Sequence, residues 1–300
     1  MMRAGIRVLC LLVLGGVACQ AQELSPKWED LTAPDFVKAI HKAEGVCLLP
    51  MGSIEKSGPA EPLGTNLYVI RALTLDAVKR EYAVVFPEYF VAGTNDVSNL
   101  PGAVAYPSET QHQFLKETLG EMSRNGCKKI LIVNGHSGNN GMLTDILMTS
   151  FTEHRDYVLY MIQGGPPKVT AESMRMFGNK LPAEAMPSKP DADGHGGEER
   201  TSVMMYYYPE ITHPERGHDE PSNVSVDLKL PRNMTVSVKR MAETANGYLG
   251  DASGATAKRG KALSAYVIDS IVESIQAVKA DKLSLKLQDD FYQQQKNPLR

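Results

Sequence analysis

A stretch rich in glycine and proline, residues 50–66, constrains the fold of this chain more than any other segment. It follows a short apolar run at 45–49, typical of a buried strand, and it precedes apolar residues that recur at helical spacing. Gly52 and Gly58 flank a glutamate, Glu55, within this stretch. Open α/β sheets bind their ligands in such turns, at the carboxyl ends of the strands. We therefore expect a ligand site here.

Strand and helix patterns alternate through the first half of the chain. Apolar runs predict three further strands, at 83–87, 129–133 and 157–162, with amphipathic segments between them. The run at 129–133 is apolar after its first residue, which is typical of the interior of a parallel sheet. The alternation predicts an α/β fold with three αβα layers and a mainly parallel central sheet.

The second half of the chain is less regular. Residues 164–197 form a long excursion rich in proline and glycine, in which one short helix is expected at 171–177. Further helices are expected at 198–207 and 255–280, where apolar side chains recur at helical spacing.

Composition describes an ordinary globular protein. The chain has 42% hydrophobic residues, and its net charge of −3 comes with lysines and arginines that form no basic stripe, so nucleic acid is not expected as a partner. No linker divides the sequence. We interpret residues 22–300 as a single domain, with a core from about 28 to 280 and a loosely held polar tail after Lys282.

The first residues have the pattern of a secretory signal. Arg3 and Arg7 form a positive region, an apolar core follows at 8–14, and small residues then lead to Ala21. We interpret residues 1–21 as a signal peptide that is cleaved after Ala21. Its core is too short to span a bilayer, so no stable membrane insertion is expected after cleavage. The protein is expected to be exported, either periplasmic or secreted.

The cysteines leave alternatives open. Cys19 could instead become a lipidated N-terminal residue that anchors the mature protein to a membrane. Cleavage after Ala21 would leave Cys47 and Cys127, both in or beside apolar runs. We expect buried free thiols there, because two cysteines do not make a disulfide framework. A disulfide is the alternative in an oxidising compartment.

Three turns carry side chains suited to chemistry. Glu55 lies in the first, His136 in the second, and His195 and Glu198 in the third. A carboxylate and an imidazole from different strand ends are the first ligands that a divalent metal needs. The alternative is that Glu55 and His136 only lie near helix starts, where a carboxylate is favoured in any case.

These turns resemble the motifs of the creatininase (creatinine amidohydrolase) family. Residues 50–66 resemble P-x-G-S-x-E-Q-H-G-P-H-L-P-L-G-T-D, residues 133–139 resemble V-N-G-H-G-G-N, and residues 193–202 resemble D-x-H-A-G-x-x-E-T-S. Shorter matches at 100–102 and 250–260 extend the resemblance over almost all of the mature chain. It implies a creatininase-like fold and a hydrolase of cyclic amides that uses two neighbouring divalent ions.

Several metal-ligand positions of that family are replaced in this chain. Glu55 and His136 match two ligands of the first ion, but Asn66 stands where the family has a bridging aspartate. Ser57 replaces a histidine of the second ion, and Arg200 replaces its carboxylate. A guanidinium keeps its proton and cannot bind a metal. We therefore expect at most one divalent metal, zinc or manganese, held by Glu55, His136 and Asn66.

Arg200 has two interpretations. We expect it to fill the region of the second ion and to pair with Glu55 or Glu198, and an ordinary surface arginine is the alternative. A shift of one residue in the third motif could bring Glu199 toward the old ligand position, which would restore a carboxylate there.

The remaining site residues follow from the same resemblance. His195 keeps the position of the family's proton-transferring histidine, and we expect it to be catalytic together with Glu198. Arg200, Ser137 and Asn139 are expected to bind the substrate.

Two functions remain open on the sequence alone. One is an exported hydrolase that acts on a small, polar, cyclic molecule. The other is a non-catalytic relative that binds or scaffolds. The resemblance also implies a homo-oligomer, with contacts expected from the segment 203–207 and from the excursion 164–197.

Overall fold

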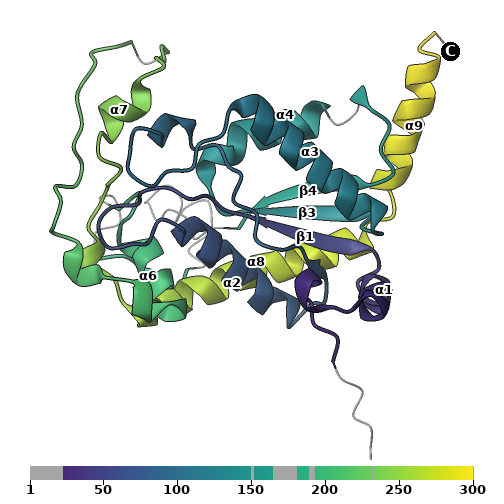
Figure 1. The fold of residues 1–300 in the computed structure, drawn as a ribbon, viewed down its shortest axis with the longest axis horizontal. Helices are drawn as coiled ribbons and strands as arrows, with labels where there is room; N and C mark the ends of the chain where they lie inside the picture. Colours follow the sequence, from purple (N-terminus) through teal and green to yellow (C-terminus); the bar gives the residue numbers. More distant parts are fainter. Residues whose placement is uncertain (1–22, 150–151, 165–180, 189–192, 232, 300) are drawn as a thin grey trace, which may run out of the picture.

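The computed structural model describes residues 23–149, 152–164, 181–188, 193–231 and 233–299. At its centre is a four-stranded parallel sheet (Figure 1). The strands lie in the order β2-β1-β3-β4 and are β1 (Val46–Met51), β2 (Val84–Val85), β3 (Lys129–Asn134) and β4 (Val158–Gln163). Met51 pairs with Asn134, which pairs in turn with Gln163. The turns after β1, β3 and β4 therefore share one edge of the sheet.

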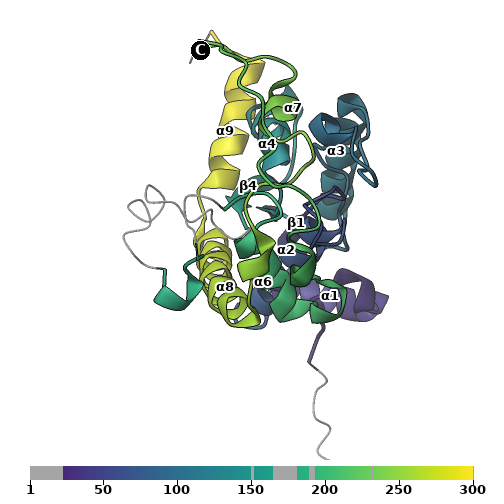
Figure 2. The ribbon, with the colours of Figure 1, turned by 90° about the vertical axis from the view of Figure 1, so that its left-hand side faces the viewer.

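Helices cover both faces of this sheet (Figures 1 and 2). One face is covered by α2 (Thr65–Val78), α6 (Glu198–Tyr207) and α8 (Ala257–Ala280). The other is covered by α1 (Ala33–Lys42), α3 (Ser108–Arg124) and α4 (Asn140–Thr149). The predicted α/β fold of three αβα layers around a parallel sheet is confirmed.

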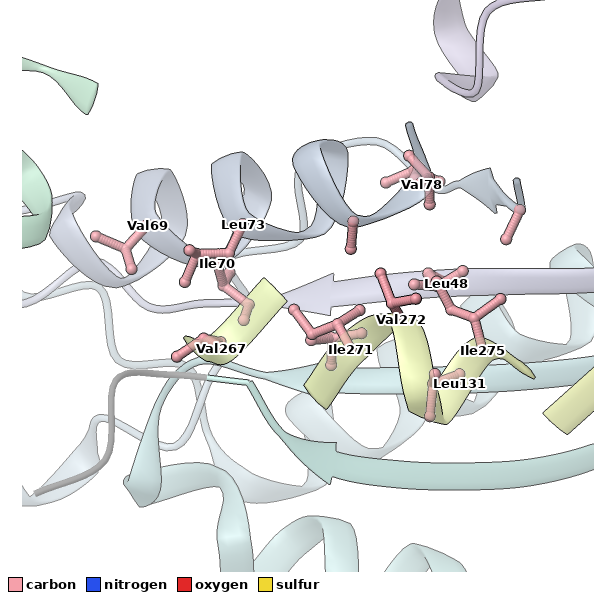
Figure 3. Close-up of a cluster of buried hydrophobic side chains, with 14 of the residues drawn as sticks. Leu48, Val69, Ile70, Leu73, Val78, Leu131, Val267, Ile271, Val272 and Ile275 are labelled. Carbon is pink, nitrogen blue, oxygen red and sulfur yellow. The ribbon is translucent and has the colours of Figure 1, made fainter. Parts of the chain in front are cut away.

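Alternate residues of β1 face the two helical layers. Val46 and Leu48 pack in the core with α2 and α8, part of which is shown in Figure 3. Cys47 and Leu49 pack in the core with α1, α3 and α4. This division follows from the two-residue period of an extended strand. All four side chains are fully buried, so the strand is fixed from both sides and positions the turn that follows it.

The tail after Lys282 is not loosely held, which corrects the expectation from its polar sequence. It forms a helix, α9 (Ser284–Lys296). The hydroxyl of Tyr292 donates to the carbonyl of Glu153 at 2.8 Å, and Nε2 of Gln288 donates to the carbonyl of Tyr157 at 3.0 Å. A helix held by polar contacts of this kind does not need apolar residues at helical spacing, so the sequence pattern did not predict it. The other short elements are α7 (Lys239–Glu243) and three-residue 3-10 helices at Trp28–Asp30, Asn95–Val97 (η2), Ser137–Asn139, Ala183–Ala185, Pro209–Ile211, Pro214–Arg216 and Ala252–Gly254.

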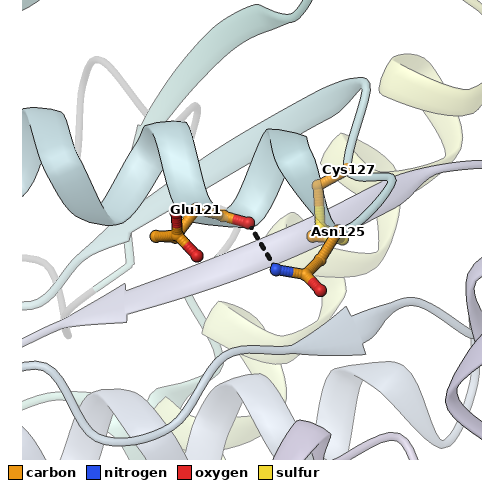
Figure 4. Close-up of a disulfide and its surroundings, with 4 residues drawn as sticks. Glu121, Asn125 and Cys127 are labelled. Carbon is orange, nitrogen blue, oxygen red and sulfur yellow. Dashed lines mark hydrogen bonds between the residues drawn. A yellow bond between two sulfur atoms is a disulfide. The ribbon is translucent and has the colours of Figure 1, made fainter. Parts of the chain in front are cut away.

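Cys47 and Cys127 form a disulfide, so the expectation of free thiols is wrong (Figure 4). Cys47 lies in β1, and Cys127 lies between α3 and the neighbouring strand β3. Their Cα atoms are 5.6 Å apart, within the range that a disulfide spans. The turn that carries Cys127 is also closed by Asn125, whose Nδ2 donates to the carbonyl of Glu121 at 2.8 Å. The sequence showed that both residues are buried, but not that their segments are adjacent.

Some predictions fall outside the described residues. The signal peptide at 1–21, with Cys19, and the helix expected at 171–177 lie there. Among the described helices, none is both long and apolar enough to cross a membrane. Val203 and Met204, which were expected at a subunit contact, are buried in the chain's own core with α8. Assembly into a homo-oligomer stays a prediction.

Candidate active site

A cavity of about 480 Å³ lies where the turns after β1 and β3 meet the start of α6. Most of the residues that the sequence singled out share it. Its lining consists of Glu55, Ser57, Asn66, Asp96, Val97, His136, Ser137, Gly138, Gly194, His195, Gly196, Glu199, Arg200, Arg240 and Leu249. The three motif-bearing turns therefore form one site.

Glu55 is the centre of the hydrogen bonds in this cavity. Its Oε1 lies 2.9 Å from Nδ1 of His136 and accepts from Nδ2 of Asn66 at 2.6 Å and from Oγ of Ser53 at 3.2 Å. Burial acts to raise the pKa of Glu55, but the hydrogen bond and charge of His136 outweigh it and lower the pKa to about 2. Glu55 is therefore an anion at neutral pH.

The short contact between His136 and Glu55 requires a proton or a metal ion between the two side chains. Its Nε2 lies 3.1 Å from the carbonyl oxygen of Gly93, which can only accept, so Nε2 carries a proton. Nδ1 faces a carboxylate oxygen, and two lone pairs at 2.9 Å would repel each other. Either a proton or a metal ion must lie between them. A ring N–H on a backbone carbonyl is also the usual arrangement of a metal-binding histidine.

Arg200 holds the Asn66 amide in one orientation. Nη1 of Arg200 donates to Oδ1 of Asn66 and, at 3.2 Å, to the carbonyl of Gly135. Asn66 therefore turns Nδ2 toward Glu55, because the reverse orientation would place two donors against each other. Arg200 does lie in the cavity, but its hydrogen bonds go to the amide and a carbonyl. The expected pairing with Glu55 or Glu198 is wrong.

His195 comes close to the first turn through its side chain. Nε2 lies 2.9 Å from the carbonyl oxygen of Lys56 and 3.2 Å from Oγ of Ser57, so Nε2 carries the proton and Nδ1 keeps the lone pair. Burial lowers the pKa of His195, which keeps the ring uncharged at neutral pH. Gly196 permits this approach, since its φ is +74° and a Cβ there would lie 2.6 Å from the backbone of Ser57.

Glu198 is not brought to the cavity. Its carboxylate accepts from the backbone N–H and the hydroxyl of Ser188, at 2.8 and 2.6 Å, and from Arg259. These contacts lie beside a neighbouring cavity of about 530 Å³. Successive residues of a helix point about 100° apart, so Glu198 and Arg200, two positions apart, point to nearly opposite sides. Glu198 therefore points away from the cavity when Arg200 faces it.

Asn139 supports the site without lining the cavity. It is fully buried, and its Oδ1 accepts from the backbone N–H of Gly93 at 2.8 Å. Because the carbonyl of Gly93 binds Nε2 of His136, Asn139 helps to fix that ring from behind. Ser137 does line the cavity, and its role in binding the substrate stays a prediction.

Two residues of this region were missed. Arg240 lines the cavity from α7, in a stretch without any motif. Glu61 is buried, its Oε1 lies 2.9 Å from the hydroxyl of Thr201, and its Oε2 has no hydrogen-bond partner among the described residues. Burial raises the pKa of Glu61 to about 8, although the charge of Arg200 opposes this shift. The sequence could have indicated Glu61, because this chain has a glutamate at the position where the first motif of the family has leucine.

The residues present do not fit a pair of metal ions. Among the described residues, no three histidine, cysteine, aspartate or glutamate side chains converge as metal ligands. The guanidinium of Arg200 lies on the amide that replaces the bridging carboxylate, and its charge would repel a second cation. Within the described part of the cavity, Glu55 and His136 form a pair of side chains that could hold a single ion. Asn66 presents its nitrogen there, so its oxygen could become a ligand only after the amide turned.

Comparison with known proteins gives a consistent result. A family model described as creatininase, creatinine amidohydrolase, matches residues 29–275. The mycofactocin precursor peptide peptidase of Mycolicibacterium smegmatis is 25% identical over 257 residues, which cover 83% of this chain and 91% of that protein. Creatinine amidohydrolase of Pseudomonas putida is 22% identical over 256 residues, which cover 82% of this chain and 94% of that one.

Solved structures show the same fold. A crystal structure of creatinine amidohydrolase matches with a TM-score of 0.67 and 19% identity, over 87% of this chain and 100% of that one. Other solved creatininases include a zinc–zinc form and a manganese form. The matched family model spans all four strands and the three turns that build the cavity. The chain belongs to the creatininase family.

Proposed function

We propose that the protein is an exported hydrolase of the creatininase family that opens an amide bond in a small, polar, cyclic substrate. The observation that carries the proposal is the presence of an uncharged imidazole, His195, in the same cavity as the Glu55–His136 pair. His195 can thus accept a proton in the same cavity in which Glu55 is paired with His136. Relatives named as an amidohydrolase and as a peptidase support amide cleavage.

We propose that the site takes at most one divalent ion, zinc or manganese. Glu55 and His136 would hold it, and Asn66 would join them if its amide turned. Such an ion, when bound, polarises a carbonyl group and lowers the pKa of a bound water.

His195 is the proposed proton carrier. The lone pair on Nδ1 accepts a proton from the attacking water as the new C–O bond forms. The resulting imidazolium then gives its proton to the amide nitrogen of the substrate as the C–N bond breaks. The charge of Glu55 and the Lys56 carbonyl favour the imidazolium, which makes the transfer reversible. Arg200 and Ser137, which both line the cavity, are proposed to bind the polar groups of the substrate.

Replacing His195 with asparagine is expected to reduce kcat about 10²- to 10⁴-fold, the usual loss when a general acid–base group is removed. The assay follows ring opening in a panel of cyclic amides, with and without added zinc or manganese. His41→Asn, an exposed position on α1, is the matched control and should leave the rate unchanged. Elemental analysis of the same samples should find at most one ion per chain. Two tightly held ions, or an unchanged rate in the His195 variant, would contradict the proposal.

A non-catalytic binding or scaffolding protein is the second candidate. The hydrogen bond between Arg200 and Asn66 favours it, because it places a fixed cation where the ligand set of the family is broken. The same assay separates the two candidates. Small amides that bind in calorimetry but are not cleaved by the wild-type protein, with either metal present, would favour this second function.

We also propose export, with a mature chain that begins at Gln22, or at Cys19 if it is lipid-anchored. The disulfide between Cys47 and Cys127 supports this, because disulfides persist in oxidising compartments and are rare in the cytosol. The protein would then be periplasmic or secreted. Intact-mass measurement of protein from its native host tests the prediction, and a retained Met1 would overturn it.

A further inference from the structure

Two arginines line the cavity with hydrogen-bond donors that the described residues do not use. Nη1 of Arg200 is bound to Asn66 and Gly135, but its Nε and Nη2 donate to no described residue. Nε of Arg240 is buried and has no hydrogen-bond partner in the described part of the chain. The carboxylate of Asp96 lies 4.0 Å from it, beyond hydrogen-bond distance. Nε is closed to solvent, so a ligand in the cavity would bind the terminal nitrogens of Arg240, which donate to no described acid.

Arg240 is held over the cavity by the packing of α7. This short helix contacts η2, and Nδ2 of Asn99 donates to Sδ of Met241 at 3.2 Å. The Arg240 side chain makes one long contact within its own segment, from Nη1 to Oγ1 of Thr244 at 3.5 Å. The charges of both arginines help to lower the pKa of His195, so both act on the ring that would carry the proton.

The carboxylates of the cavity limit what the ligand can be. Glu55 is already paired with His136 and Asn66, and the side chain of Asp96 is 54% exposed. Glu199 also lines the cavity, so a simple anion would meet an acid as well as two arginines. A molecule with both a carboxylate and an amide N–H matches this surface better. Its carboxylate can accept from guanidinium groups while its N–H donates to Asp96, which also lines the cavity.

We propose that the substrate is a small cyclic amide that carries a carboxylate, bound between the guanidinium groups of Arg200 and Arg240. The proposal rests on the proposed function, because the amide is the bond that the site would cleave. Guanidinium groups bind carboxylates through parallel N–H···O bonds, which fix the direction of the ligand as well as its position. The carboxylate would thereby hold the ring with its amide beside His195.

Binding to two matched pairs of probes tests the charge requirement without turnover. L-Pyroglutamate and dihydroorotate are cyclic amides with a carboxylate, and L-pyroglutamamide and dihydrouracil are their uncharged counterparts. Calorimetry on the mature protein is expected to show binding about tenfold tighter or more for the carboxylate member of at least one pair, as expected for hydrogen bonds to a charged group. Equal affinities in both pairs, or no binding of either carboxylate, would overturn the proposal.

Variants of α7 then assign the effect to Arg240. Arg240→Gln is expected to weaken carboxylate binding about tenfold or more and to leave the uncharged probe unchanged. Lys239→Gln removes the same charge from an exposed neighbour and should change neither. Arg240→Lys should recover only part of the affinity, because an ammonium lacks the planar fork. Equal weakening of both probes by Arg240→Gln would indicate a structural role and overturn the proposal. Failure of the proposed function would give a different result from failure of this proposal. The carboxylate probes would then still bind more tightly than their uncharged counterparts, but none would be cleaved.

Discussion

Replacing both disulfide cysteines, Cys47→Ala with Cys127→Ala, is expected to lower the free energy of unfolding by about 4 kcal/mol. The two residues are 80 positions apart, and a cross-link that closes such a loop restricts the unfolded chain by about 4 to 5 kcal/mol. Both residues are also fully buried in the core between the sheet and α3, so their loss leaves a small void. Urea unfolding followed by circular dichroism measures the difference.

Reduction provides the control for this prediction. Wild-type protein treated with a thiol reductant should unfold near the urea midpoint of the double variant, because both then lack the bridge. The double variant itself should not respond to the reductant. A loss below about 1 kcal/mol, with the bridge verified by mass in the wild type, would contradict the expectation and would mean that the unfolded chain stays compact without it.

Replacing Glu61 with glutamine is expected to remove a large pH dependence of stability. The hydroxyl of Thr201 has one proton and two oxygen neighbours, the carbonyl of Gly197 at 2.7 Å and Oε1 of Glu61 at 2.9 Å. Both oxygens share the single hydroxyl proton of Thr201, and Oε2 of Glu61 has no hydrogen-bond partner among the described residues, so a buried carboxylate is poorly stabilised here. This geometry agrees with a pKa that burial raises to about 8. Glu61 is therefore mainly protonated and neutral in the folded protein at pH 7.

A carboxyl group whose pKa is higher in the folded than in the unfolded chain stabilises the fold only while it is protonated. The contribution of Glu61 is complete below the ordinary pKa of 4.5 and is lost as the pH rises through about 8. Between about pH 6 and pH 9 the loss amounts to about 3 kcal/mol. Glutamine keeps the shape of the side chain and never ionises, so Glu61→Gln should remove this part of the pH dependence.

Urea unfolding at the two ends of this pH range measures the effect. Glu184→Gln, at an exposed position, is the matched control and should keep the wild-type dependence. Parallel stability curves for the wild type and Glu61→Gln would contradict the assignment of a neutral carboxyl group.

Part of the site could be predicted because it depends on local patterns. Glu55 and His136 each follow an apolar run, and neighbouring parallel strands end at the same edge, so their meeting followed from the alternation of strand and helix. The disulfide could not be predicted in the same way. An apolar run shows that Cys47 and Cys127 are buried, but it does not show which segments become neighbours.

Side-chain direction and contacts between distant segments could not be predicted either. Glu198 and Arg200 belong to one motif, but the rotation of the helix sends one side chain to the cavity and the other to Arg259. The hydrogen-bond partner of Arg200 depends on the orientation of a single amide. Arg240 reaches the site only because α7 packs on η2, and no local pattern reports that contact.

The hydrogen bond between Arg200 and Asn66 also couples these two positions in any mutational return to a family-type ligand set. Arg200→Glu alone would place a carboxylate against Oδ1 of Asn66, and turning the amide would bring that oxygen against Glu55 instead. Either orientation leaves two acceptors in contact, which is unfavourable in a buried site. Asn66→Asp alone would keep the contact with Arg200, but it would replace Nδ2 with an acceptor oxygen that faces Oε1 of Glu55. The two positions are therefore epistatic, because neither single substitution restores a family-type ligand set without two acceptors in contact.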